Sequence, residues 1–473
     1  MLSNPQPSSI AGGRAIRAPG LRTAPPATSA PVADRQARLA REDAWETHPI
    51  RKLSLYFCLA ALFLRLSVLP EVILYVTHVN TYLLYLVAPP AILSTLLMGG
   101  VRRTLQARAP YYWLAFFAWM ILATPFSSWP GGSAGRVFTY GRVDLIFLFL
   151  VGGMALNWKE VRAIFRTVAA AALVNLATTR IFEQVVKGRV SLQASGTIGN
   201  SNDLAAQMLL VLPFLLFFML GRGRSMFLRI AVLGLLVYGI WIIFGTASRG
   251  GLIALMVVFL YLLFHMSLPQ KFLLVVGAGA IAVAALVALP AQTLSRLGSL
   301  FGEKHQEAKE SAESREYLFR TSVMYTIQHP IFGVGPDQFS NFEGKSSRAA
   351  GEFGAWHETH CSFTQVSSEC GVPAFIFFTA GLGSALLMVR RTYRDAKRDG
   401  YVEIANGCFC YLLAMTGYLS AAVFLADAYT FRLPAMVGLA VTLSFAARRT
   451  MELGPPPEAA MAPGPLPQRI RRR

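Results

Sequence analysis

Residues 271–290 read KFLLVVGAGAIAVAALVALP, an apolar run whose one charged residue, Lys271, stands at its start. A helix needs about 20 mostly apolar residues to cross the hydrocarbon core of a bilayer. The rest of the chain has the same character, because 54% of its 473 residues are hydrophobic and only 15% are charged. A soluble domain usually carries about a quarter charged residues. The composition excludes a soluble enzyme, a secreted mini-protein and a fibre, and it predicts a polytopic membrane protein.

Similar apolar runs occur along most of the chain, and they predict an all-α protein with about twelve transmembrane helices. The predicted spans are residues 53–69, 80–98, 111–127, 138–156, 161–178, 203–220, 226–245, 250–266, 271–290, 372–389, 405–425 and 431–447.

The basic residues indicate how these spans are oriented. The formal net charge of +19 would by itself suggest a nucleic-acid partner, but nucleic-acid binders display their basic residues on soluble surfaces. Lys and Arg instead gather in short cytoplasmic loops of membrane proteins. With the N-terminus inside, 29 of the 44 basic residues lie on the cytoplasmic side, whereas the outer loop 70–79 has none. We therefore expect both termini in the cytoplasm and no nucleic-acid partner.

The two ends of the chain differ in composition from the rest. Residues 1–48 are basic and rich in proline, with no periodic apolar face, and we expect a disordered cytoplasmic tail. Residues 451–473 include GPPPEAAMAPGPL and predict a second disordered cytoplasmic tail. Between them, residues 49–450 are expected to form one transmembrane domain. The five cysteines include no CxxC pair, so neither a disulfide scaffold nor a thiolate zinc site is predicted.

One loop is much longer than the others. Residues 291–371 lie between the predicted ninth and tenth spans, on the outer side, and loops of this length are often functional. The stretch 314–330, SREYLFRTSVMYTIQHP, predicts an amphipathic helix capped by Ser314 and ended by Pro330. Its predicted apolar face consists of Leu318, Phe319, Val323, Met324 and Ile327. The GVGP sequence at 333–336 then predicts a turn.

Ionisable residues at or near the outer face are the functional candidates, because burying a charge in a membrane is costly. Arg249 stands in FGTASRGGLIAL, where two apolar helices meet. An arginine there can bind a ligand, or its side chain can extend to the lipid headgroups. Arg315 and Arg320 lie on the predicted loop helix, where solvation or a local ion pair is the simpler interpretation of each. Arg180 is another basic residue of the outer face.

His360 lies shortly before the tenth span, near the outer membrane boundary. A histidine with a near-neutral pKa can accept a proton from an attacking hydroxyl group, or it can simply be a hydrogen-bonded interfacial residue. His357, Glu358 and His360 match no zinc motif, so we expect no metal site.

The GTIGNSNDLA sequence at 196–205 opens the sixth span and contains Asn200. Its polar residues fit either a polar pocket or a loop that caps the helix.

Taken together, five stretches resemble those of the bacterial O-antigen ligase and O-antigen polymerase family. These integral membrane glycosyltransferases act on undecaprenyl-diphosphate-linked glycans. The stretches are PFSSWPGGS (125–133), GTIGNSNDLA (196–205), TASRGG (246–251), ESREYLFRTSVMYTIQHPIFGVGPDQF (313–339) and THCSFTQVSSECG (359–371). They occur in the family's order, and the resemblance covers about residues 110–450.

The resemblance implies roles for individual residues. Arg249 and Arg315 match the two arginines that bind the lipid diphosphate, and His360 matches the catalytic histidine. Secondary candidates are Arg180, Arg320, Asn200 and Glu369. The chain departs from the family pattern at three positions: Cys361 replaces an asparagine, Phe319 a tryptophan and Thr364 a leucine. These departures concern recognition of the acceptor more than the basic chemistry.

The resemblance also implies a GT-C-type membrane enzyme of the bacterial inner membrane, with its active site at the periplasmic face. It would transfer a glycan from undecaprenyl diphosphate to an acceptor hydroxyl group of lipid A core or another glycan. The transfer would invert the anomeric carbon, with His360 as general base and without a metal or cofactor. Membrane lipids are the other expected partners. An O-antigen or exopolysaccharide polymerase and a protein O-oligosaccharyltransferase are the alternatives within the family, and a twelve-span secondary transporter is a more distant one.

Overall fold

The structure is a computed structural model that describes residues 48–453 with gaps. The gaps are residues 187, 194, 195, 197, 222, 290, 292, 295–305 and 352–355, and only the backbone is described for residues 306–312. The chain divides into two units, Met1–His48 and Pro49–Arg473, and every element named below belongs to the second. The predicted disordered tails lie outside the described residues, except for His48 and residues 451–453. Residues 451–453 are helical and form the end of the last helix, so the prediction of disorder is wrong for them.

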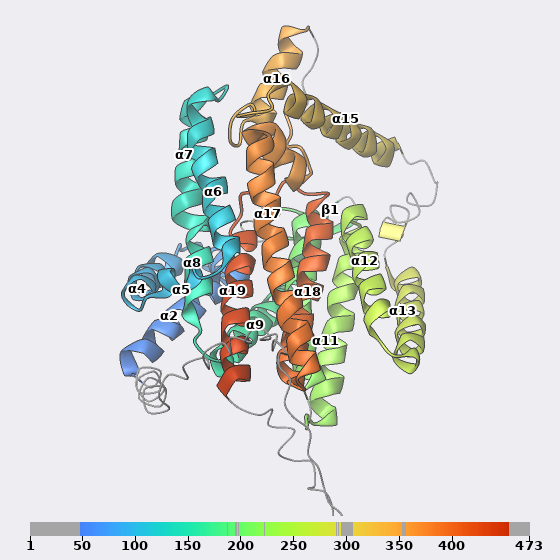
Figure 1. Cartoon of the computed structure of the whole chain (residues 1–473). Helices are drawn as coiled ribbons and strands as arrows, with labels where there is room; N and C mark the ends of the chain where they lie inside the picture. Colours follow the sequence, from blue (N-terminus) through green and yellow to red (C-terminus); the bar gives the residue numbers. More distant parts are fainter. Residues whose placement is uncertain are drawn as a thin grey trace, which may run out of the picture. The chain divides into compact units, whose positions relative to one another are not determined.

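The first half of the second unit consists of helices and a β-hairpin (Figure 1). The helices are α2 (Pro49–Leu66), α3 (Leu69–Thr77), α4 (Leu83–Leu97), α5 (Gly100–Thr104), α6 (Arg108–Ala123), the 3-10 turn η1 (Thr124–Phe126), α7 (Pro130–Thr139), the π-helical turn η2 (Tyr140–Asp144), α8 (Ile146–Met154) and α9 (Trp158–Phe182). Strands β1 (Glu183–Val186) and β2 (Arg189–Leu192) pair antiparallel, with Val185 opposite Val190.

The second half is helical. It contains α10 (Ser201–Leu220), α11 (Met226–Gly245), α12 (Arg249–His265), α13 (Leu268–Ala288), α15 (Gln306–Gln328), α16 (Phe339–Ala349), α17 (Ser362–Arg398), α18 (Val402–Ala422) and α19 (Arg432–Leu453). Side-chain caps fix several of the starting points. Asn200 caps α10, Ser225 caps α11 and Ser248 caps α12, each by accepting backbone N–H groups of the first turn.

Many of these helices have the length and composition of membrane spans. Within the described residues, seven helical stretches are long and apolar enough to cross a membrane, if α7, η2 and α8 (Pro130–Met154) are taken as one. The number is eight if α2 and α3, bent by 64°, also form one span. In α13 only 6% of the apolar window is buried inside the protein, as expected of a helix that faces lipid. Each of the predicted runs overlaps a helix, but α4 and α12 are shorter than a full span. The protein is an all-α membrane protein, and the predicted number of twelve spans is not confirmed.

The interior of the bundle is formed by helices far apart in sequence. α10 packs against α18, α17 against α6, and α19 against α8. A cluster of buried aromatic rings joins α6, η2, α17 and the segment before α19, and consists of Trp113, Phe116, Tyr140, Phe378 and Tyr429. The indole N–H of Trp113 donates to the Tyr140 hydroxyl at 2.8 Å, which satisfies a buried donor.

Helix α17 is broken near its start. Gly371 has φ 81° and ψ 176°, a backbone conformation that residues with a Cβ rarely adopt, so the helix has a short first part and a long second part. The segment before α16 lies against this break: Val334 N–H donates to the carbonyl of Ser368 at 2.9 Å, and Val372 N–H donates to that of Pro330 at 2.8 Å. The break thus ties the long outer segment to the bundle.

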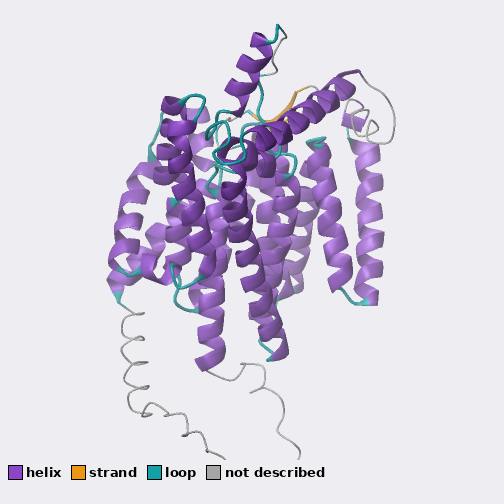
Figure 2. Cartoon of the chain, turned by 45° about the horizontal axis from the view of Figure 1, so that its top comes forward, coloured by secondary structure: helices purple, strands orange, loops and turns teal. Residues whose placement is uncertain are grey.

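Helices α15 and α16 lie at the end of the bundle where α17 begins (Figures 1 and 2). The predicted loop helix exists, but α15 begins at Gln306, so Ser314 lies inside it and is not its cap. The predicted apolar face is also wrong, because only Leu318 of that set is buried. The side of α15 facing α17 is partly polar, with the Thr326 and Ser367 hydroxyl groups 2.8 Å apart. The other four residues of the predicted face are exposed.

Candidate active site

Arg249 is the first residue of α12, and the backbone around it is tightly fixed. The Ser248 hydroxyl caps the helix by accepting the N–H group three residues later at 3.2 Å. Ala247 has φ 45°, in the left-handed region that is uncommon for residues with a Cβ. Gly250 allows close packing, since a Cβ there would overlap the Phe424 side chain. The TASRGG sequence therefore sets the position of Arg249 against the neighbouring helices.

Arg315 projects from α15 and is half-buried. Burial lowers the pKa of its guanidinium group, and the positive charge of Arg249 lowers this pKa further. Two cations from distant segments are therefore close enough to repel one another in partly desolvated surroundings. Such an arrangement becomes favourable when an anion binds between the charges.

His360 lies in the segment just before α17. It is half-buried and has φ 52°, a left-handed conformation that costs energy in a residue with a Cβ and is frequent at functional sites. Burial lowers the pKa of His360 to about 4, and the neighbouring Arg315 and His357 lower it further. The imidazole is thus neutral near pH 7, so one ring nitrogen can accept a proton.

The three principal candidates belong to three separate segments, and Arg315 is within electrostatic range of the other two. Arg315 influences the titration of His360, and Arg249 influences that of Arg315. The resulting site has two permanent cations beside a neutral base. Chemically, it is suited to bind a doubly charged anion and to remove a proton from a group held next to it.

A second group of ionisable residues, which sequence reasoning did not assign to the site, lies on the same outer segments. Arg136 of α7 donates to the Tyr429 carbonyl at 3.0 Å and lies 4.0 Å from a carboxylate oxygen of Asp337. Burial raises the pKa of Asp337. Although Glu358 is an exposed residue as a whole, desolvation raises the pKa of its carboxyl group, and the charge of Asp337 raises it further. The left-handed turn at Asp337 (φ 61°) that creates this arrangement has no signature in the sequence beyond the preceding GVGP.

Glu369 is buried, with 3% of its surface exposed, and it holds the turn that carries Asp337. Its two carboxylate oxygens accept the backbone N–H groups of Asp337 at 2.9 Å and of Phe339 at 3.2 Å. Its contacts identify it as a positioning residue for the outer segment.

The other secondary candidates have local partners. Asn200 accepts the N–H groups of Asn202 at 2.8 Å and of Asp203 at 3.1 Å, which is the capping arrangement. Arg320 is exposed and pairs with Glu316 at 2.5 Å. Arg180 is exposed in the last turn of α9. The described contacts do not connect these three residues with His360.

A buried polar network supports the site from within the bundle. Arg432 of α19 donates to both carboxylate oxygens of Asp427 at 3.0 Å and to the Gln207 side-chain oxygen at 2.9 Å. Tyr418 donates to the same carboxylate. The N–H group of Asp427 donates to the hydroxyl of Ser362 at 2.9 Å, only two residues after His360. The network thus ties α10, α18 and α19 to the start of α17.

Among the described side chains, no group of three or more His, Cys, Asp or Glu residues is arranged to hold a metal ion.

Comparison with known families agrees with this part of the molecule. Residues 234–379 match the family model described as O-antigen ligase. The family resemblance is confirmed over these residues. The matched segment contains Arg249, Arg315 and His360, and its similarity to this family is consistent with a membrane glycosyltransferase of the O-antigen ligase and polymerase type. No curated protein matches the chain.

Proposed function

We propose that the protein transfers a glycan from an undecaprenyl-diphosphate donor to an acceptor hydroxyl group, in the manner of an O-antigen ligase acting on lipid A core. The observation that carries this proposal is that Arg315 lies within electrostatic range of both Arg249 and His360, although the three residues come from separate segments. The match of the same segment to the O-antigen ligase family supports the class of reaction.

In this proposal the two arginines bind the donor's diphosphate. A diphosphate is already a good leaving group, so the protein mainly has to neutralise the charge that develops as the glycosidic bond breaks. Guanidinium groups present rigid pairs of donors that suit phosphate oxygens. An anion bound near both guanidinium groups would offset the repulsion between Arg249 and Arg315, which favours a doubly charged ligand.

His360 acts as the general base. The acceptor oxygen forms a bond to the anomeric carbon while the hydroxyl proton passes to the imidazole ring. The bond from the anomeric carbon to the phosphate oxygen breaks, and its electron pair leaves with the lipid diphosphate. Attack opposite the leaving group inverts the anomeric carbon. The neutral state of His360 near pH 7 supports this role, and the activated donor makes ATP, a metal and other cofactors unnecessary.

The surface of α15 supports a lipid-linked donor. Arg315, Phe319, Val323 and Ile327 follow one another at four-residue spacing and so lie along one side of the helix. The three apolar residues are between 37% and 73% exposed. An amphiphile could place its diphosphate at Arg315 and the start of its prenyl chain on this stripe.

We further propose a GT-C-type enzyme in the bacterial inner membrane, with both termini in the cytoplasm and the site at the periplasmic face. The predominance of basic residues in the predicted cytoplasmic loops supports this orientation. The transmembrane domain would extend over residues 49–450, between two disordered tails.

Deletion of the gene followed by electrophoresis of surface lipopolysaccharide tests the function. Loss of all O-chain supports a ligase, whereas retention of a single repeat indicates a polymerase. An unchanged ladder with loss of protein-linked glycan indicates a protein O-oligosaccharyltransferase. If neither is affected, the proposed function is wrong. Complementation with His360→Ala should fail, and complementation with His265→Ala, at the opposite end of α12, should succeed.

A further inference from the structure

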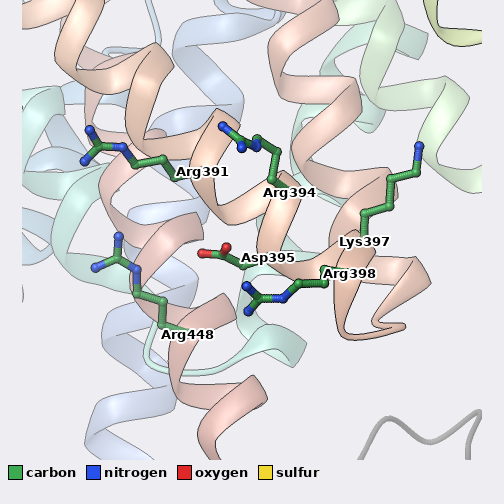
Figure 3. A pocket seen from close by; sticks show the side chains of 6 residues that line it. All are labelled: Arg391, Arg394, Asp395, Lys397, Arg398 and Arg448. Carbon is green, nitrogen blue, oxygen red and sulfur yellow. The ribbon is translucent and has the colours of Figure 1, made fainter.

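The C-terminal ends of α17 and α19 enclose a basic cavity at the end of α17 opposite to the candidate active site (Figure 3). Its volume is about 670 Å³. It is lined by Arg391, Arg394, Asp395, Lys397, Arg398 and Arg448. In Figure 3 Asp395 lies between Arg448 and Arg398, whereas the Lys397 amine points away. Five cations and one carboxylate give this cavity a strong positive charge.

Two of the cations have an evident local role. Lys397 and Arg398 lie in the last turn of α17, where positive charge stabilises the helix C-terminus. Arg398 also pairs with Asp399 at 2.8 Å, and Lys397 lies 5.9 Å from the centre of the Tyr393 ring.

The other three are not explained in this way. Arg391 and Arg394 come earlier in α17, and Arg448 comes from α19. Within the described residues, no carboxylate lies within 4.0 Å of any of these three guanidinium groups. These three cations line one cavity with a single carboxylate, Asp395, so they repel one another and an additional anion among them would relieve that repulsion.

The surface of α17 above the cavity is apolar and open. Ile376 is 54% exposed and Leu387 is 53% exposed. Between them, a Cβ added at Gly383 would have nothing within 4 Å. The spacing of seven and then four residues puts all three on one side of the helix, and Arg394 continues that side toward the cavity. The helix thus presents an apolar stripe that ends at a group of cations.

We propose that this cavity binds an anionic phospholipid, with its phosphate among Arg391, Arg394 and Arg448 and an acyl chain along Gly383 and Leu387. Basic pockets at the ends of transmembrane helices suit lipid phosphate groups. The apolar stripe favours a lipid over a soluble phosphate compound, because only a lipid occupies both parts. The site is distinct from the proposed glycosyl-transfer site and does not depend on that function.

Binding of phosphatidylglycerol labelled on its acyl chain to the full-length protein in phosphatidylcholine nanodiscs tests the proposal. We expect saturable binding that Arg391→Gln/Arg394→Gln/Arg448→Gln weakens by roughly 100-fold, since each cation near a membrane surface contributes about fivefold. The control is a variant with the same loss of charge at exposed arginines outside the cavity: Arg102→Gln/Arg108→Gln/Arg166→Gln. The affinity of this control for phosphatidylglycerol should stay within about threefold of the wild type, because salt screens most of the effect of distant charges.

A second variant separates a lipid from a soluble ligand. Leu387→Asn should weaken lipid binding, because it makes the proposed acyl-chain surface polar while leaving the charge of the cavity unchanged. Inorganic phosphate at about 10 mM, which would occupy a site with a dissociation constant in the millimolar range, should not displace the labelled lipid. Displacement by phosphate, with Leu387→Asn unchanged, would show that the site takes soluble phosphates. Equal weakening by the cavity variant and the charge-matched control would show general surface attraction and overturn the proposal.

Discussion

Replacing Arg432 by methionine tests whether the buried network is the anchor of the candidate active site. The substitution keeps an apolar chain of similar length but leaves the Asp427 carboxylate without its cation. The side chains of Arg432 and Asp427 are only 4% and 11% exposed, so water cannot take the place of the missing guanidinium group. Removing one partner of a buried ion pair costs about 3–5 kcal/mol.

The expected effect on thermal stability follows from this free energy. One kcal/mol shifts the melting temperature of a 150–250-residue protein by about 2–4 °C. At the lower end of that range, which suits a longer chain, Arg432→Met should lower the melting temperature by about 6–10 °C. Tryptophan fluorescence of the purified protein during heating in detergent measures this change. Because Asp427 also binds Ser362 beside His360, we expect glycan transfer to fall together with stability.

Arg398→Met is the matched control, because Arg398 forms an ion pair of similar geometry at an exposed position. An exposed pair and a charge at a helix end each contribute little, so this variant should melt within about 4 °C of the wild type. The double variant Asp427→Asn/Arg432→Met should recover part of the lost stability, since it leaves no buried charge unpaired. If Arg432→Met melted at the same temperature as Arg398→Met, the ion pair would not anchor the site.

Further predictions concern the residues of the site itself. Arg249→Lys should weaken binding of the lipid-diphosphate donor at least tenfold, because an ammonium group cannot reproduce two parallel hydrogen bonds; equal affinity in a donor-binding assay would indicate a bulk charge role. The transfer rate should be constant between about pH 6 and 8 and fall as the pH approaches 4, because His360, with a folded-state pKa of about 4, becomes protonated there. The same group destabilises the fold in acid: the unfolded chain takes up this proton first, so stability is lost as the pH falls from about 6.5 toward 4. Glu369→Ala should cost about 1–3 kcal/mol, because it leaves the backbone N–H groups of Asp337 and Phe339 without their acceptors. Protease cleavage of the outer segment should quicken, and a wild-type cleavage pattern would contradict the positioning role.

Hydrophobic runs predicted the helices well where a helix is apolar along its whole length. The run 226–245 and α11 (Met226–Gly245) have the same bounds. The prediction was poorer where polar residues continue a helix beyond its apolar part. The predicted span 372–389 is only the middle of α17, which starts at Ser362 and continues through the basic residues up to Arg398. Hydropathy detects the membrane-embedded part of a helix and is insensitive to its extensions.

Packing partners explain the remaining differences. The apolar residues of α15 predicted a buried face, but burial depends on the surface that the helix meets, and α17 offers a hydroxyl group at Ser367. Motifs identified Arg249, Arg315 and His360, because each stands in a distinctive local sequence. Contacts such as that between Arg432 and Gln207 join residues far apart in the chain, and no local pattern predicts them.

Release of free lipid diphosphate by the purified full-length protein, supplied with a lipid-diphosphate-linked glycan, tests the proposed glycan transfer directly. We expect release only when an acceptor with a free hydroxyl group is present. His360→Ala should slow release by about 10²–10⁴-fold while still binding the donor, and His265→Ala should not. Release at the wild-type rate by His360→Ala, or equal release without an acceptor, would show that the protein does not transfer the glycan in this way.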